Sequence, residues 1–88
     1  MKQKFEIDGC HFSSAEEFYE ELTRVLGLRE WGRNLDALRD VLSGGFGTPE
    51  EGFMLTWKNS KISEENLNAF DTIVKIFSEH KNIALILK

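Results

Sequence analysis

Residues 31–42 read Trp31-Gly32-Arg33-Asn34-Leu35-Asp36-Ala37-Leu38-Arg39-Asp40-Val41-Leu42, a stretch that predicts a short amphipathic helix. Asn34 is a favourable N-cap residue, because its side-chain oxygen accepts a hydrogen bond from a backbone N–H of the first turn. Leu35, Leu38 and Leu42 recur at helical spacing, so we expect them to form the buried side of the helix. The following run Ser43-Gly44-Gly45 is expected to end it, since glycine reaches the left-handed conformation without a Cβ clash.

Two acidic residues of this helix, Asp36 and Asp40, are four positions apart. That spacing puts both carboxylates on one face, about 5–6 Å apart at Cβ, where they repel each other. Asp40 also lies near the C-terminal end of the helix, where the helix dipole disfavours negative charge. Stability alone does not favour this arrangement. The pair is either part of a solvated face, with Asp36 paired to Arg39, or a binding site for a cationic partner.

The composition limits the class of protein. The chain has 88 residues, 41% of them hydrophobic, which predicts one globular domain spanning residues 1–88. Its formal net charge of −4 argues against nucleic acid as a direct ligand and favours a basic protein partner. Cys10 is the only cysteine, so no internal disulfide forms and a reducing cytoplasm is expected. No signal peptide is visible, and the longest apolar run, Ile83 to Leu87, is too short to span a membrane.

The pattern along the chain predicts an α/β fold. Residues 4–8 alternate as a half-buried strand, and Ser14 caps a helix that ends at Gly27. After the central helix, residues 53–57 and 83–87 are apolar enough for inner strands, and a third helix starting at Ser63 and ending at Asn82 separates them. The order β-α-α-β-α-β implies parallel strands joined by crossover helices. We expect two layers, a three-stranded parallel sheet packed against three helices.

Catalysis, metal binding and cofactor binding have little support in the sequence. His11 and His80 fit no metal-ligand or nucleophile motif, and Cys10 next to His11 lacks a second ligand pair. The acid pair would need a cleft to act as an acid and a base. We therefore expect no enzyme activity and no cofactor. The glutamates at 16, 17, 20 and 21 are expected to form a solvated helix face, and Trp57 to lie in the core.

The run Trp31-Gly32-x-Asn34-Leu35-Asp36-Ala37-Leu38-x-Asp40-x-Leu42 resembles the barstar family, small cytosolic inhibitors of secreted microbial ribonucleases. The resemblance covers nearly the whole chain. It includes Ile7-Asp8-Gly9, the helix opened by Ser14, the strand Phe53-Met54-Leu55-Thr56-Trp57, the segment Ile73 to Glu79 and the strand Ile83 to Leu87. It implies a barstar-like fold and a one-to-one, non-enzymatic inhibitor of a basic ribonuclease, monomeric when free. The alternative is an immunity or protein-interaction module that neutralises a different basic toxin.

The resemblance also implies the partner-binding residues. Asp40 would be the chief contact, Asp36 its partner and Glu79 a peripheral contact. The remaining candidates are Glu30, Trp31, Gly32, Asn34, Arg39 and Phe46. Trp31 is either an interface residue or packs on the helix end. The chain departs from the family where aromatic residues are common, at Glu30, Arg39 and Gly45, and at Arg33, where an acid is frequent. With three extra residues around Glu50-Glu51-Gly52, these changes indicate a divergent target that has an acidic spot facing one of the arginines.

Overall fold

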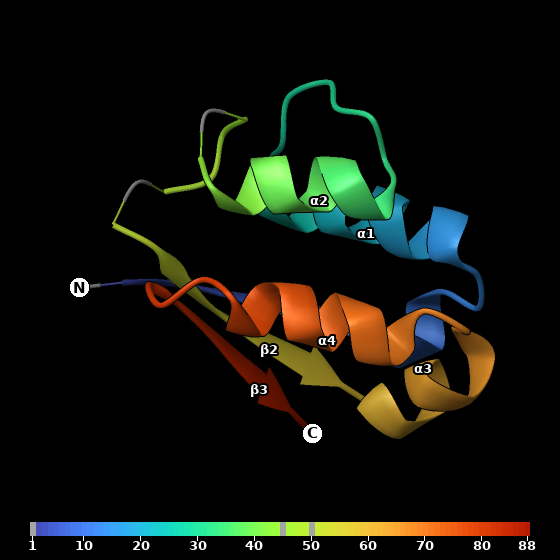
Figure 1. Ribbon diagram of the computed structural model, residues 1–88. Coiled ribbons are helices and arrows are strands. Elements are labelled where there is room, and N and C mark those ends of the chain that lie inside the picture. Colours follow the sequence, from blue (N-terminus) through green and yellow to red (C-terminus); the bar gives the residue numbers. More distant parts are fainter. Residues whose placement is uncertain (1, 45, 50) are drawn as a thin grey trace.

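The computed structural model describes residues 2–44, 46–49 and 51–88. Figure 1 shows its elements in chain order. They are β1 (Gln3–Asp8), the 3-10 helix η1 (Gly9–His11), α1 (Ala15–Leu26), α2 (Leu35–Leu42), β2 (Phe53–Lys58), α3 (Ser60–Asn66), α4 (Phe70–Ser78) and β3 (Ile83–Leu87). The longest of these described helices has 12 residues, and none of them is long and apolar enough to cross a membrane.

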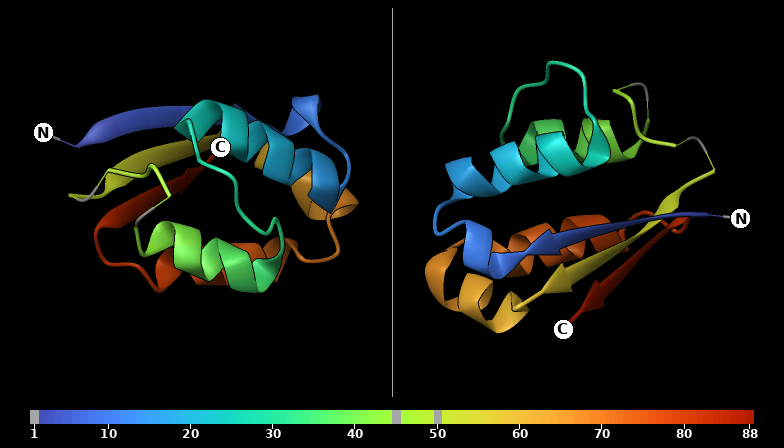
Figure 2. Two further views of the ribbon diagram at one scale, coloured as in Figure 1. Left: turned by 90° about the horizontal axis from the view of Figure 1, so that it is seen from above. Right: turned by 180° about the vertical axis from the view of Figure 1, so that it is seen from behind.

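The three strands form one parallel sheet in the order β1-β2-β3, as predicted. Phe5, Leu55 and Leu85 are aligned across the sheet, so they share one face. Helices α1 and α4 contact β1 and β3, respectively, and both lie on the same side of the sheet (Figures 1 and 2). α2 packs on α4 and lies farther from the strands, which leaves its outer side facing solvent.

The core is centred on the end of the middle strand. The ring of Trp57 is fully buried and stacks on Phe18 of α1, with ring centroids 5.1 Å apart and planes at 13°. Its indole Nε1 donates a hydrogen bond of 2.9 Å to Oγ of Ser63, which is also fully buried. This confirms the prediction that Trp57 is a core residue, and it explains how a polar indole nitrogen is accommodated there.

The prediction of a single third helix is wrong, because the described residues contain four α-helices. The segment divides into α3 and α4 at Leu67, whose backbone is extended with φ −105° and ψ 112°. Asn66 and Asn68 flank Leu67, and asparagine favours turns over helix interiors. α3 contacts η1 whereas α4 contacts β3, so the two pieces cover different parts of the molecule. The division also places Ser63 inside α3 rather than at its N-cap.

The acidic face predicted on α1 is correct only in part. Glu21 is 9% exposed and is paired with Arg24 and with Nδ1 of His11 at 3.0 Å. Burial raises the pKa of the Glu21 carboxyl, but the hydrogen bonds from Arg24 and His11 outweigh burial, and the net shift of its pKa is downward. The other glutamates of the set, at positions 16, 17 and 20, are exposed.

Candidate partner-binding site

The start of α2 follows the predicted capping pattern. Asn34 has an extended backbone, and its Oδ1 accepts a hydrogen bond of 2.8 Å from the backbone N–H of Ala37. Leu38 and Val41 are fully buried and Leu42 is 4% exposed, which fixes the inner side of the helix. Asp36, Arg39 and Asp40 are exposed on the outer side. The helix thus presents both carboxylates to solvent on a backbone held by its cap and its buried side.

The end of α2 also follows from its sequence. Ser43 is the C-cap residue, and its backbone N–H donates to the carbonyl groups of Arg39 and Asp40 at 3.1 and 3.2 Å. Gly44 adopts a φ of +107°, a conformation that glycine tolerates. Gly45, one of the positions at which the sequence was expected to depart from the family that it resembles, lies outside the described residues, as does Glu50 of the extra segment.

An ion pair joins α2 to the end of α4 and thereby brings two predicted site residues together. Nε of Arg39 donates to Oε1 of Glu79 at 3.0 Å, and Nη2 lies 3.5 Å from Oε2. Nη1 of Arg39 is 4.0 Å from Oδ1 of Asp36, a long contact to a fully exposed carboxylate. Within the described part of the chain, Asp40 has no ion-pair partner.

The Arg39–Glu79 pair stabilises the charge of both groups. Hydrogen bonding and attraction to Glu79 raise the pKa of the Arg39 guanidinium. Hydrogen bonding to Arg39 in turn lowers the pKa of the Glu79 carboxyl, with the charge of Arg39 adding to the effect. Both side chains remain partly exposed, at 47% for Arg39 and 40% for Glu79. The pair is therefore formed at the surface, where a partner protein can reach it.

Trp31 packs on α1. Its side chain is 7% exposed, and its Nε1 donates to Oγ1 of Thr23 at 2.8 Å. Its ring meets Tyr19 edge-to-face, with centroids 5.5 Å apart. Trp31 thus ties the loop before α2 to α1, a contact with a different helix from the one expected. Thr23, the residue that receives the indole N–H, was not singled out in the sequence, because nothing in the local pattern links positions eight residues apart.

The remaining candidates surround the start and end of α2. Glu30 is exposed in the preceding loop. Gly32 is exposed too, and a Cβ there would lie 3.0 Å from Cβ of Ala37, so a larger residue would press on the helix start. Phe46 is partly buried against the core, and its carbonyl accepts a hydrogen bond of 2.8 Å from the backbone N–H of Arg29. This bond holds the loops on either side of α2 together.

A second arginine lies close to the acid pair. Arg33 has a left-handed backbone, with φ of 53°, and lines a shallow depression together with Asp36 and Tyr19. Asp36 therefore has Arg39 on its own helix and Arg33 at the helix entrance. The outer side of α2 is a mixed surface of acids and arginines rather than a uniformly acidic one. Sequence reasoning identified both arginines as departures but not the contact between Arg39 and Glu79.

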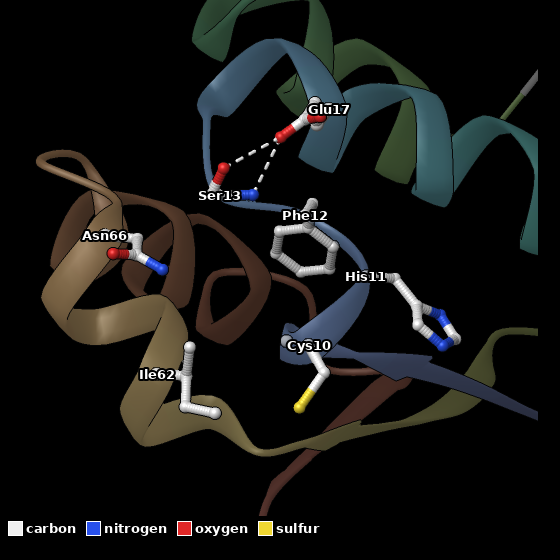
Figure 3. Close-up of a pocket in the computed structure, with 8 residues that line it drawn as sticks. Cys10, His11, Phe12, Ser13, Glu17, Ile62 and Asn66 are labelled. Atoms are coloured by element: carbon white, nitrogen blue, oxygen red, sulfur yellow. Dashed lines mark hydrogen bonds between the residues drawn. The ribbon is translucent and has the colours of Figure 1, made fainter.

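A different depression, of about 480 Å³, lies between η1 and α3 (Figure 3). The imidazole of His11 points away from Cys10 there, and Glu17 accepts hydrogen bonds from Ser13. Desolvation and the nearby Asp8 carboxylate raise the pKa of the Cys10 thiol, which disfavours the reactive thiolate. In residues 2–44, 46–49 and 51–88, no three His, Cys, Asp or Glu side chains are grouped to hold a metal ion.

The family comparison agrees with this arrangement. The family model described as Barstar (barnase inhibitor) matches residues 2–84, nearly the whole chain. The search of curated proteins found no match to the chain. The three-stranded parallel sheet with its helices fits the fold of that family. Its members are inhibitors rather than enzymes, so the match implies a role of ribonuclease-inhibitor type. With the match extending over so much of its length, the chain belongs to the barstar family.

Proposed function

We propose that this protein is a stoichiometric inhibitor of a basic microbial ribonuclease, whose active site it blocks with the carboxylates of Asp36 and Asp40. The observation that carries the proposal is the match to the barstar family over residues 2–84. It is supported by the exposure of both carboxylates on a capped helix.

The mechanism is mimicry of the RNA phosphate. A ribonuclease active site holds a phosphate with arginine, lysine and histidine side chains, which donate charge-assisted hydrogen bonds to its oxygens. Asp40 has no competing ion-pair partner among the described residues, so its carboxylate is available to these donors without breaking an existing contact. Asp36 has, within the part of the chain that the structure describes, only the long ion-pair contact to Arg39. We therefore assign Asp40 the main contact and Asp36 the second one.

The rest of the surface belongs to the same proposal. Glu30, Gly32, Asn34 and Phe46 border the two ends of α2, and Trp31 contributes its small exposed edge. The inhibitor acts as a monomer, one copy per nuclease, in the cytoplasm, where a single exposed and unpaired Cys10 is stable as a thiol. It turns over no substrate.

The test is capture from a panel of purified basic microbial ribonucleases and basic toxins of other classes, followed by titration of the captured protein and, for a ribonuclease, an RNA-cleavage assay. Asp40→Ala should weaken binding about thirtyfold or more, because loss of the carboxylate leaves desolvated cations of the partner unpaired. The matched control is Asp71→Ala, which removes the same charge from an exposed position in the first turn of α4. Asp71→Ala should bind and inhibit as the wild type does.

Two outcomes would contradict the proposal. If no ribonuclease is retained while basic toxins of another class are, the chain is an immunity module for a different partner. If a ribonuclease is retained but Asp40→Ala binds as tightly as Asp71→Ala, the acid pair is not the centre of the interface.

A further inference from the structure

Arg39 occupies an unexpected place for a protein that binds a cationic active site. It lies on the outer side of α2 between Asp36 and Asp40 in the sequence, and its side chain is 47% exposed. A partner surface that is positive throughout would be pressed against this fixed cation when water leaves the interface. Juxtaposed like charges strongly disfavour a complex, so Arg39 restricts which nucleases fit.

Glu79 is already engaged in the free protein. Both of its carboxylate oxygens face Arg39, at 3.0 and 3.5 Å; Arg39 belongs to α2, whereas Glu79 is the C-cap residue of α4. A partner cation that bound Glu79 would have to approach Arg39 as well or displace it. The geometry thus favours Glu79 as the counter-ion that holds Arg39 in place, rather than as a contact for a cation of the nuclease.

Arg39 keeps donors for a partner. A guanidinium has five N–H groups in a planar fork that matches a carboxylate. Nε and Nη2 of Arg39 contact Glu79, and Nη1 lies near Asp36. Each nitrogen faces these acids in one direction, so the remaining N–H groups of the guanidinium are free of both carboxylates. An acidic side chain on the nuclease would pair with these donors and offset the repulsion from the cations around it.

We infer that Arg39 and Glu79 act together to select a nuclease that has an acidic residue opposite Arg39. This acidic residue would lie beside the cationic site that receives Asp40, so the inference rests on the function proposed above. Arg39 makes the contact, and Glu79 is a positioning residue that acts through it. The preferred partner surface is a mosaic of positive and negative charges, in keeping with the second arginine, Arg33, beside Asp36.

The first experiment is a cycle of variants titrated against the ribonuclease captured by the wild-type chain. Arg39→Ala should raise the dissociation constant about tenfold, less than Asp40→Ala does. Glu79→Gln should raise it severalfold in the wild type but by less than about twofold in the Arg39→Ala background. A nuclease cation bound directly to Glu79 predicts the opposite, an undiminished effect of Glu79→Gln when Arg39 is absent, and that result would overturn the inference. Tighter binding by Arg39→Ala would overturn it as well.

The second experiment locates the acidic residue. Each Asp and Glu around the active site of the captured ribonuclease is changed to Asn or Gln and titrated against both the wild type and Arg39→Ala. One of these changes should weaken wild-type binding about tenfold and leave Arg39→Ala binding nearly unchanged; additive effects at every position would refute the inference.

The matched control for Arg39→Ala is Lys61→Ala, which removes a positive charge from the exposed side of α3. It should change binding less than twofold.

Urea melts test whether each variant folds. We expect that it does, because the side chains of Arg39 and Glu79 are partly exposed and neither belongs to the core. The two proposals fail in different ways. If no ribonuclease binds the wild type, the proposed function fails and this inference with it. If a ribonuclease binds and depends on Asp40 but shows no coupling to Arg39, only the inference fails.

Discussion

Replacement of Asn34 by alanine tests whether this residue serves the interface by holding α2 or by touching the partner. The change removes the 2.8 Å hydrogen bond from the backbone N–H of Ala37 to Asn34 Oδ1. The second side-chain bond, from Nδ2 to the carbonyl of Gly32, is 3.4 Å long and weak. Loss of an N-cap costs about 0.5–2 kcal/mol, and we expect a value near the middle of that range because α2 has only eight residues. For a chain of this size, 1 kcal/mol lowers the melting temperature by about 4–8 °C.

The measurement is urea unfolding followed by tryptophan fluorescence, since Trp31 and Trp57 are both buried. Asn34→Asp is the control, because aspartate keeps the capping oxygen and adds a negative charge at the positive end of the helix. It should be at least as stable as the wild type. Nuclease binding by Asn34→Ala should weaken much less than binding by Asp40→Ala. Unchanged stability combined with a large loss of binding would refute the capping argument and make Asn34 a direct contact.

Three further predictions concern the core, pH and salt. Ser63→Ala leaves the buried indole N–H of Trp57 without its 2.9 Å acceptor, so the free energy of unfolding in urea should fall by about 1–3 kcal/mol; a neutral effect would show that another acceptor is available. The folded pKa of Glu21 is below its usual 4.5, so its contribution to stability is complete above that value and is lost as the pH falls through the lowered pKa. Urea melts of Glu21→Gln should therefore depend less on pH below about 4.5 than melts of the wild type, and equal dependence would contradict the ion-pair assignment. In stopped-flow binding to the captured ribonuclease, salt should slow association much more than it changes dissociation, whereas an association rate insensitive to salt would indicate a mainly apolar interface.

The elements that the sequence predicted well are those determined by neighbouring residues. Ser14 and Asn34 cap the helices that follow them, and Gly27 ends α1 in a left-handed conformation. The alternation in residues 4–8 and the apolar runs before Trp57 and after Asn82 correspond to the three strands. Each of these signals lies within a few residues of the structure that it specifies, so reading it requires no knowledge of the rest of the fold.

The features that the sequence did not predict depend on contacts between distant positions. Asn66 and Asn68 favour a turn between α3 and α4, but the apolar spacing continues across them, and the two helices cover separate surfaces, on η1 and on β3. Glu21 is buried because η1 places His11 beside it, and Trp31 packs on α1 because Thr23 accepts its indole N–H. Arg39 and Glu79 are 40 positions apart, and their pairing requires that α2 lie on the end of α4. No spacing rule relates such residues before the fold is known.

The net charge of the chain, although it indicates a basic partner, does not locate the interface. Residues 29–40 carry three arginines and three acidic residues, so the segment around the acid pair is neutral, and the excess negative charge of the chain lies elsewhere. Part of it is on α1, where Glu16, Glu17 and Glu20 are exposed. Charge at a distance acts on the rate of encounter, whereas charge inside a desolvated contact acts mainly on the rate of dissociation. The excess charge is therefore suited to attracting many basic proteins, and the mixture of acids and arginines on and just before α2 to retaining only those with a matching surface. A partner search based on basicity alone would overlook that second requirement.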